Sequence, residues 1–296
     1  MTRATMSKNF HGIWIPIVTP FQHGKVDFPA LQKLAHHLKN AGVSGLVACG
    51  TTGEAAALDE DEQLAVLDAL IAAVPDLPVV MGLCGNNLNE VHARLREIQR
   101  RPIAGVLVPP PYYIRPSQQG LCVYFKSIAD AAFVPVIIYN IPYRTGVAMT
   151  LETIRTIAEH PNVTAIKDCG GDSALTMQMI IDGQLAVLAG EDIQLFSTMC
   201  LGGAGAIAAS AHLHPELFVQ LAHLIHDQEL AQARSLFHRL LPMIQLSFAE
   251  ANPGPVKAAL AHLGLIHNEL RDPMQRASDH VAGKLIAELQ GQDSAG

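Results

Sequence analysis

The sequence predicts a closed (β/α)8 barrel, also called a TIM barrel, with a helical extension at its C-terminal end. About eight short apolar runs alternate with longer segments of helical periodicity, which is typical of a parallel sheet buried on both faces. The length of 296 residues, with 49% hydrophobic residues, accommodates a barrel of roughly 250 residues. The G-x-G-x-x-G pattern of a dinucleotide-binding sheet is missing after the first run, which disfavours an open doubly wound fold.

The eight expected strands are continuous apolar stretches that end at turn or polar residues. They are short, and several are rich in valine and isoleucine, as buried strands are. Their expected ranges are residues 12–18, 45–49, 78–82, 104–108, 135–139, 162–167, 185–189 and 204–208.

A helix is expected after each strand, because apolar residues recur there three and four positions apart. Asp59 is a plausible N-cap, since acidic residues follow it in the first turn. The expected helices span residues 27–40, 59–73, 88–100, 117–132, 150–159, 173–182, 193–200 and 215–226.

No strand signal remains beyond residue 226. Three further helices are expected at residues 228–245, 255–264 and 274–289, before a polar tail. The expected organisation is therefore a barrel over residues 1–226 that carries the active site, with residues 227–296 forming helices packed on it.

Composition excludes several classes of partner. The net charge is −7 with both signs interspersed, and no basic patch with aromatic residues suggests nucleic acid. No apolar run approaches the ~20 residues of a membrane span, so no membrane partner is expected. The polar N-terminus lacks the apolar core of a signal peptide. Five cysteines without a C-x-x-C pattern then indicate reduced thiols in a cytoplasmic protein.

Functional side chains are expected at the C-terminal ends of the strands, where barrel enzymes place their active sites. Those ends carry an amine, phenols, hydroxyls and a guanidinium, a set suited to carbonyl chemistry. The residues are Thr51, Thr52, Tyr112, Tyr113, Tyr139, Arg144 and Lys167, with Gly190 and Ile207 at the last two strand ends.

Lys167 is the central candidate, because it ends a strand expected to be buried. Burial lowers the pKa of a lysine, and a neutral amine is a nucleophile toward carbonyl groups. Tyr139 and Thr51 could relay protons to it, and the backbone N–H groups around Thr52 could cradle a carboxylate. Arg144 could bind a second carboxylate through a bidentate fork.

Several conspicuous residues have simpler explanations. His212 and His214 suggest a metal site, but no carboxylate or cysteine shares ligand spacing with them, so no metal is expected. Cys169 lacks a nearby histidine to activate it as a nucleophile. The tyrosine pair 112–113 could be packing aromatics, and Arg144 could belong to a surface ion pair.

Four motifs at residues 50–54, 111–113, 139–146 and 166–168 fall in one order and spacing. With the late stretch 252–257, the chain resembles the dihydrodipicolinate synthase / N-acetylneuraminate lyase family of class I aldolases over nearly its whole length. The resemblance implies a homo-oligomer, either a dimer or a tetramer, that acts on pyruvate and a small aldehyde or 2-oxo acid. It also implies that no cofactor is needed, because the covalent imine forms on Lys167.

The resemblance further implies roles for individual residues. Tyr139 would transfer protons through Thr51 and through Tyr113, which would reach into a neighbouring subunit's site. Thr51 and Thr52 would hold the pyruvate carboxylate. Arg144 would bind the carboxylate of aspartate semialdehyde, as it does in the synthases of the family but not in the neuraminate lyases.

The synthase reaction is therefore expected, with two alternatives. Tyr143 stands where the synthases usually carry a small residue, and this favours an aldolase or dehydratase for another 2-oxo acid of sugar-acid or sialic-acid type. A catalytically silent ligand-binding paralogue is the third reading. The intact Lys167 and Tyr139 argue against it.

Overall fold

The computed structural model describes residues 10–293 of the chain. The polar start of the chain and the last three residues of its polar tail lie outside this range. Among the described residues, no helix combines the length and apolar character that crossing a membrane requires.

Eight parallel strands close into a barrel, which confirms the predicted fold class. Their order around the barrel is β1-β10-β9-β8-β7-β6-β5-β4. The strands are β1 (Gly12–Pro16), β4 (Gly45–Ala48), β5 (Val79–Gly82), β6 (Gly105–Val108), β7 (Val136–Asn140), β8 (Val163–Asp168), β9 (Ala186–Ala189) and β10 (Gly205–Ile207). Almost all of their residues are buried, as expected for a sheet covered on both faces.

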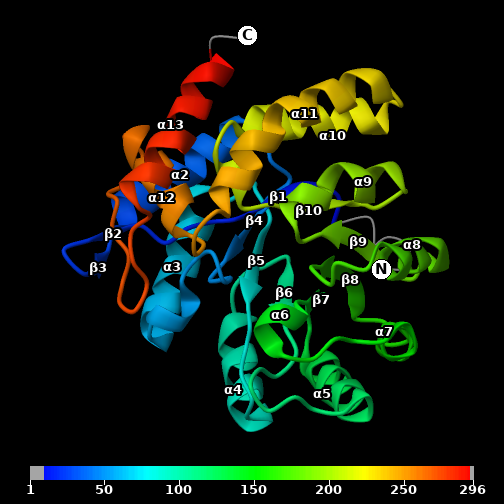
Figure 1. Ribbon diagram of the computed structural model, residues 1–296. Helices are drawn as coiled ribbons and strands as arrows, with labels where there is room; N and C mark the ends of the chain where they lie inside the picture. The colour runs from blue at the N-terminus through cyan, green and yellow to red at the C-terminus, as the bar shows by residue number, and fades with distance from the viewer. Residues whose placement is uncertain (1–9, 294–296) are drawn as a thin grey trace. The chain divides into compact units, whose positions relative to one another are not determined.

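The described residues divide into two compact units. The first comprises residues 10–12 and 78–207, and the second comprises residues 13–77 and 208–293. The first unit contains β5 to β10 and the helices between them (Figure 1). Those helices are α4 (Leu88–Ile98), α5 (Gln118–Ala131), α6 (Pro142–Thr145), α7 (Leu151–Ala158), α8 (Ser173–Asp182), η2 (Asp192–Gln194) and α9 (Leu195–Cys200).

The second unit contains β1, β4 and the remaining elements, and α10 (Pro215–His226) and α11 (Leu230–Ser247) run side by side in it (Figure 1). Asp59 caps α3 (Glu60–Ala73) in a full capping box with Glu62, which confirms the predicted N-cap. The elements are β2 (Phe21–Gln22), β3 (Lys25–Val26), α2 (Phe28–Asn40), η1 (Ala55–Ala57), α3 (Glu60–Ala73), η3 (Ser210–His212), α10 (Pro215–His226), α11 (Leu230–Ser247), α12 (Gly254–His262) and α13 (Asp279–Asp293).

The structure corrects three details of the sequence prediction. The strand expected to end at Lys167 continues to Asp168. The last helix begins at Asp279 rather than at 274, because the Ser278 hydroxyl accepts a hydrogen bond from the N–H of Val281 and caps it there. The hairpin β2–β3 and the single turn of α6 were not predicted, since such short elements show no periodicity.

Candidate active site

Lys167 and Tyr139 lie opposite each other on the neighbouring strands β8 and β7. The lysine Nζ is 3.3 Å from the tyrosine hydroxyl and 4.4 Å from the centre of its ring. Both residues are more than nine-tenths buried. The first unit thus brings an amine and a phenol into contact in a site that largely excludes water.

The next register pair along the same strands, Asn140 and Asp168, fastens the strand ends together. The Asn140 amide donates to Asp168 Oδ1 at 2.9 Å, and the Thr176 hydroxyl on α8 donates to Asp168 Oδ2 at 2.6 Å. Successive side chains of a strand point to opposite faces, so these groups lie on the other face from Lys167 and Tyr139. We call Asn140, Asp168 and Thr176 the β7–β8 clamp.

Gly190, which follows β9, makes room for the lysine stem. A Cβ at this position would lie 2.9 Å from Lys167 Cγ and would collide with the sulfur of Cys169. Burial raises the pKa of the Cys169 thiol despite the nearby Lys167. The thiol is therefore protonated at neutral pH, in agreement with the expectation that Cys169 is not a nucleophile.

Arg144 and its neighbour Tyr143 both belong to the short helix α6. The guanidinium carbon of Arg144 lies 5.4 Å from the centre of the Tyr143 ring. Tyr143 is 64% exposed as a residue, but burial of its hydroxyl end raises the pKa of the phenol. The proximity of Cys169 and Glu191 acts in the same direction, so the phenol lies near the strand ends that carry Lys167.

The remaining predicted residues of the first unit occupy different environments. Ile207 ends β10 and is fully buried. Tyr113 is 90% exposed and has a left-handed backbone with φ of 72°, so it does not belong to the buried cluster around Lys167. The N–H of Tyr112 donates to the Asn86 side chain at 3.0 Å, which anchors this exposed loop.

Thr51 and Thr52 follow β4 in the second unit. Thr51 is exposed, whereas Thr52 is buried and its hydroxyl accepts a hydrogen bond from the Asn252 amide at 2.9 Å. The turn is closed by the N–H of Glu54, which donates to the Thr51 carbonyl at 3.1 Å. Loop residues 50–54, which we call the threonine loop, thus form a folded turn tied to the segment before α12.

His212 is a buried structural residue of the second unit. Its Nδ1 lies 2.8 Å from the Ala209 carbonyl, and its Nε2 accepts from the Val18 N–H at 3.2 Å. These two contacts engage both ring nitrogens. Burial lowers the pKa of the ring to about 4. Within residues 10–293, no group of three or more His, Cys, Asp or Glu side chains is arranged to hold a metal ion.

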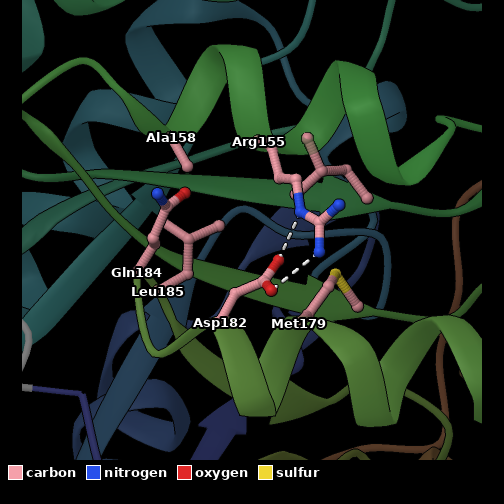
Figure 2. A pocket seen from close by; sticks show the side chains of 7 residues that line it. Arg155, Ala158, Met179, Asp182, Gln184 and Leu185 are labelled. Carbon is pink, nitrogen blue, oxygen red and sulfur yellow. Dashed lines mark hydrogen bonds and ion pairs between the residues drawn. The ribbon is translucent and has the colours of Figure 1, made fainter.

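A shallow groove lies between α7 and α8, far along the strands from Lys167. Arg155 and Asp182 bridge it with two hydrogen bonds of 2.6 and 2.8 Å (Figure 2). Leu185 in its wall immediately precedes β9, so the groove lies at the N-terminal ends of the strands, whereas Lys167 lies near their C-terminal ends. Its enclosed volume of about 10 Å³ is room for about one water molecule, which is too little for a substrate.

The sequence predicted Lys167, Tyr139 and Gly190, but it missed the β7–β8 clamp and Asn252. An amide or carboxylate after an apolar run reads as ordinary loop composition. The available signal was that Tyr139–Asn140 and Lys167–Asp168 repeat the same arrangement at the ends of adjacent expected strands.

Comparison with known proteins shows extensive similarity. The sequence model of the Dihydrodipicolinate synthetase family matches residues 9–292. A protein of Clostridium acetobutylicum named 4-hydroxy-tetrahydrodipicolinate synthase 2 is 35% identical over 278 residues, covering 93% of this chain and 97% of that protein. The 4-hydroxy-tetrahydrodipicolinate synthase of Haloarcula marismortui is 36% identical over 292 residues, which covers 96% of this chain and 95% of that one.

Solved structures show the same similarity. The dihydrodipicolinate synthase of Thermotoga maritima has a TM-score of 0.93 and 32% identity, covering 96% of this chain and 99% of its own. A monomeric dihydrodipicolinate synthase variant has a TM-score of 0.94 and 31% identity, covering 97% of this chain and 98% of its own.

Proposed function

Because the chain belongs to the dihydrodipicolinate synthetase family, we propose that it is a Schiff-base pyruvate aldolase. Its reaction is the condensation of pyruvate with aspartate 4-semialdehyde to give 4-hydroxy-tetrahydrodipicolinate. The observation that carries this proposal is the buried contact of 3.3 Å between Lys167 Nζ and the Tyr139 hydroxyl.

In the first half-reaction, Lys167 Nζ attacks the C2 carbonyl carbon of pyruvate. The carbinolamine loses its oxygen as water, and an imine forms on the lysine. Tyr139 gives and takes the protons of these steps, since its hydroxyl is within hydrogen-bond reach of the amine. Loss of a C3 proton then gives the enamine. The protonated imine nitrogen receives the electron pair, so the chemistry needs no added cofactor.

In the second half-reaction, the enamine C3 attacks the aldehyde carbon, and the new alkoxide takes up a proton. The amine of the semialdehyde then attacks the imine carbon, which closes the ring and releases Lys167 as a free amine. One water leaves over the whole cycle. Thr51 and Thr52 bind the pyruvate carboxylate, Thr51 and Tyr113 extend the proton relay, and Arg144 binds the second carboxylate. Gly190 and Ile207 line the substrate site.

The test is reductive trapping. Pyruvate followed by borohydride should add the mass of one reduced pyruvate to the peptide that contains Lys167. Lys257, which is also deeply buried, is an internal control in the same digest, because its amine is held in an ion pair. If Lys167 stays unmodified at neutral pH and at a temperature where the protein is folded, the Schiff-base mechanism is refuted.

A second candidate function is supported by Tyr143. Its phenol lies near Cys169 and Glu191 and its ring lies beside the Arg144 guanidinium, so we propose that it limits the size of the second substrate. An aldolase or dehydratase for another 2-oxo acid, with a hydroxyl for the phenol to bind, fits this feature. Rates with a panel of aldehydes separate the two functions. If the synthase reaction is native, Tyr143→Ser should not improve activity with aspartate semialdehyde.

Assembly and location follow the same reasoning. Tyr113 and Ile114 are exposed at 90% and 57%, and a dimer or tetramer would cover them and bring Tyr113 to a neighbouring site. Sedimentation of the purified protein measures the assembly.

We place the enzyme in the cytoplasm, which accords with all five cysteines being thiols.

A further inference from the structure

Lys257 and Glu54 form a buried ion pair in the second unit. The lysine Nζ lies 2.8 Å from Glu54 Oε2, and the two side chains are 0% and 2% exposed. The same ammonium donates to the Glu269 carbonyl at 2.8 Å and lies 4.3 Å from the centre of the Phe21 ring. Within the described part of the chain, the second oxygen of Glu54 has no hydrogen-bond partner. Lys257 is therefore the direct counter-charge of this carboxylate.

Such a pair is not explained by stability alone. Removing two charges from water costs several kcal/mol per ion, and apolar side chains of similar volume often serve as well or better. Burial raises the pKa of Glu54 and lowers that of Lys257, so each group depends on the other to stay charged. In some proteins, a buried ion pair of this kind serves to set one specific conformation.

One member of the ion pair, Glu54, belongs to the threonine loop. Glu54 is the last residue of that loop and has a left-handed backbone with φ of 54°, which an L-residue adopts only under constraint. The Thr19 hydroxyl donates to the Gly53 carbonyl at 2.7 Å, and Asn252 donates to Thr52. Side chains from residues 252–257 thus hold the loop at both Thr52 and Glu54.

We propose that Lys257, acting through Glu54, is a positioning residue that fixes the threonine loop in the shape that receives the carboxylate of the 2-oxo acid. The inference rests on the proposed function for the identity of the ligand. It assigns Lys257 no contact with substrate. Its effect is on the concentration of 2-oxo acid that half-saturates the enzyme, and the reactivity of Lys167 stays unchanged.

The decisive variant is Glu54→Met with Lys257→Met. A single change at Lys257 would strand a buried carboxylate and impair folding, whereas the double change removes both charges and puts unbranched apolar side chains of similar volume in their place. The matched control is Lys39→Met, which makes the same substitution in the same unit but breaks the surface ion pair with Asp76. Thermal unfolding confirms that each variant is folded.

Two readouts follow on the folded full-length proteins. Borohydride trapping is measured against pyruvate concentration, and amide hydrogen exchange is measured over residues 50–57. In the double variant, the half-saturating pyruvate concentration should rise at least about tenfold, as expected for a misplaced charged hydrogen bond. The amount of adduct at saturation should match the wild type. Exchange in the loop should accelerate in the double variant but not in Lys39→Met.

Wild-type half-saturation in the double variant would overturn the positioning role, as would unchanged exchange in the loop. An adduct that fails to form in the wild type would instead overturn the proposed function. In that case the exchange measurement alone decides the positioning role, and unchanged protection rejects it.

Discussion

The stem of Lys167 fits against β9 because residue 190 has no side chain. We predict that Gly190→Ala lowers kcat by about 10- to 100-fold, since a shift of about 1 Å in a reacting group has effects of this size. The added methyl would lie 2.9 Å from Lys167 Cγ and collide with Cys169, so the lysine stem must shift relative to Tyr139. Steady-state kinetics with saturating substrates measures the change.

Gly283→Ala is the control for this experiment. Position 283 lies in α13, and a Cβ there would meet nothing within 4 Å. That variant should keep the wild-type kcat and gain up to about 1 kcal/mol of stability, because alanine is the better helix former. Wild-type turnover in Gly190→Ala would contradict the packing role of Gly190.

We predict that the free energy of unfolding falls in acid because of His212. Its ring has a pKa of about 4 in the folded protein against an ordinary value of 6.5. Between these two values the unfolded chain binds a proton that the folded protein does not, so stability is complete above pH 6.5 and falls as the pH drops toward 4. The gap corresponds to about 3 kcal/mol, at about 1.4 kcal/mol per pKa unit.

Urea unfolding at a series of pH values measures this loss. His212→Gln keeps a donor and an acceptor but cannot titrate, so its unfolding free energy should decline less over the same range. Parallel declines in the two proteins would show that other groups are responsible.

At the scale of the elements, the β7–β8 clamp ties together the ends of the two strands that carry Tyr139 and Lys167. We predict that Thr176→Val destabilises the fold by about 1.5–3 kcal/mol, because it deletes a hydroxyl that donates to a buried carboxylate at 2.6 Å. Turnover should fall along with stability, since β8 carries Lys167. Thr176→Ser restores the hydroxyl and should recover most of both losses. If the valine and serine variants were equally stable, the Thr176 hydroxyl would have no stabilising role in the clamp.

Periodic elements were predictable, whereas features built from contacts between distant residues were not. The apolar runs and amphipathic helices were placed within a few residues, because burial imposes their pattern directly on the sequence. Lys167 stood out because a lysine conflicts with a buried strand. Asp168 did not, because a strand expected to end at Lys167 left it in a loop. The pairing of Lys257 with Glu54 left no local signal in the sequence, since the two residues lie 203 positions apart.

At the scale of the whole molecule, the proposed exchange of Tyr113 between subunits can be tested by complementation. Lys167→Ala and Tyr113→Phe should each be nearly inactive. When their subunits are mixed and reassociated, each hybrid dimer would contain one site with both residues intact, and activity should recover to about a quarter of wild type. A mixture no more active than its components would place Tyr113 in its own subunit's site or outside catalysis.

The expected boundary between a barrel domain ending at residue 226 and the C-terminal helices stays a prediction. Helices α11, α12 and α13 pack against one another in the second unit, together with α10, which was assigned to the barrel. The sequence marks where the strand pattern stops, but it carries no signal for how these helices group.

The short helix α6 also has a practical consequence for protein engineering. Lys167 and Tyr139 lie within strands and are held by the clamp, whereas Tyr143 and Arg144 lie in a helix of four residues that Gly146 ends. Under the proposed mechanism, a combinatorial library confined to positions 143 and 144 would therefore vary the residues that meet the acceptor aldehyde while leaving Lys167 and Tyr139 intact. Selection on such a library could convert the enzyme into a catalyst for new carbon–carbon bonds from one constant donor.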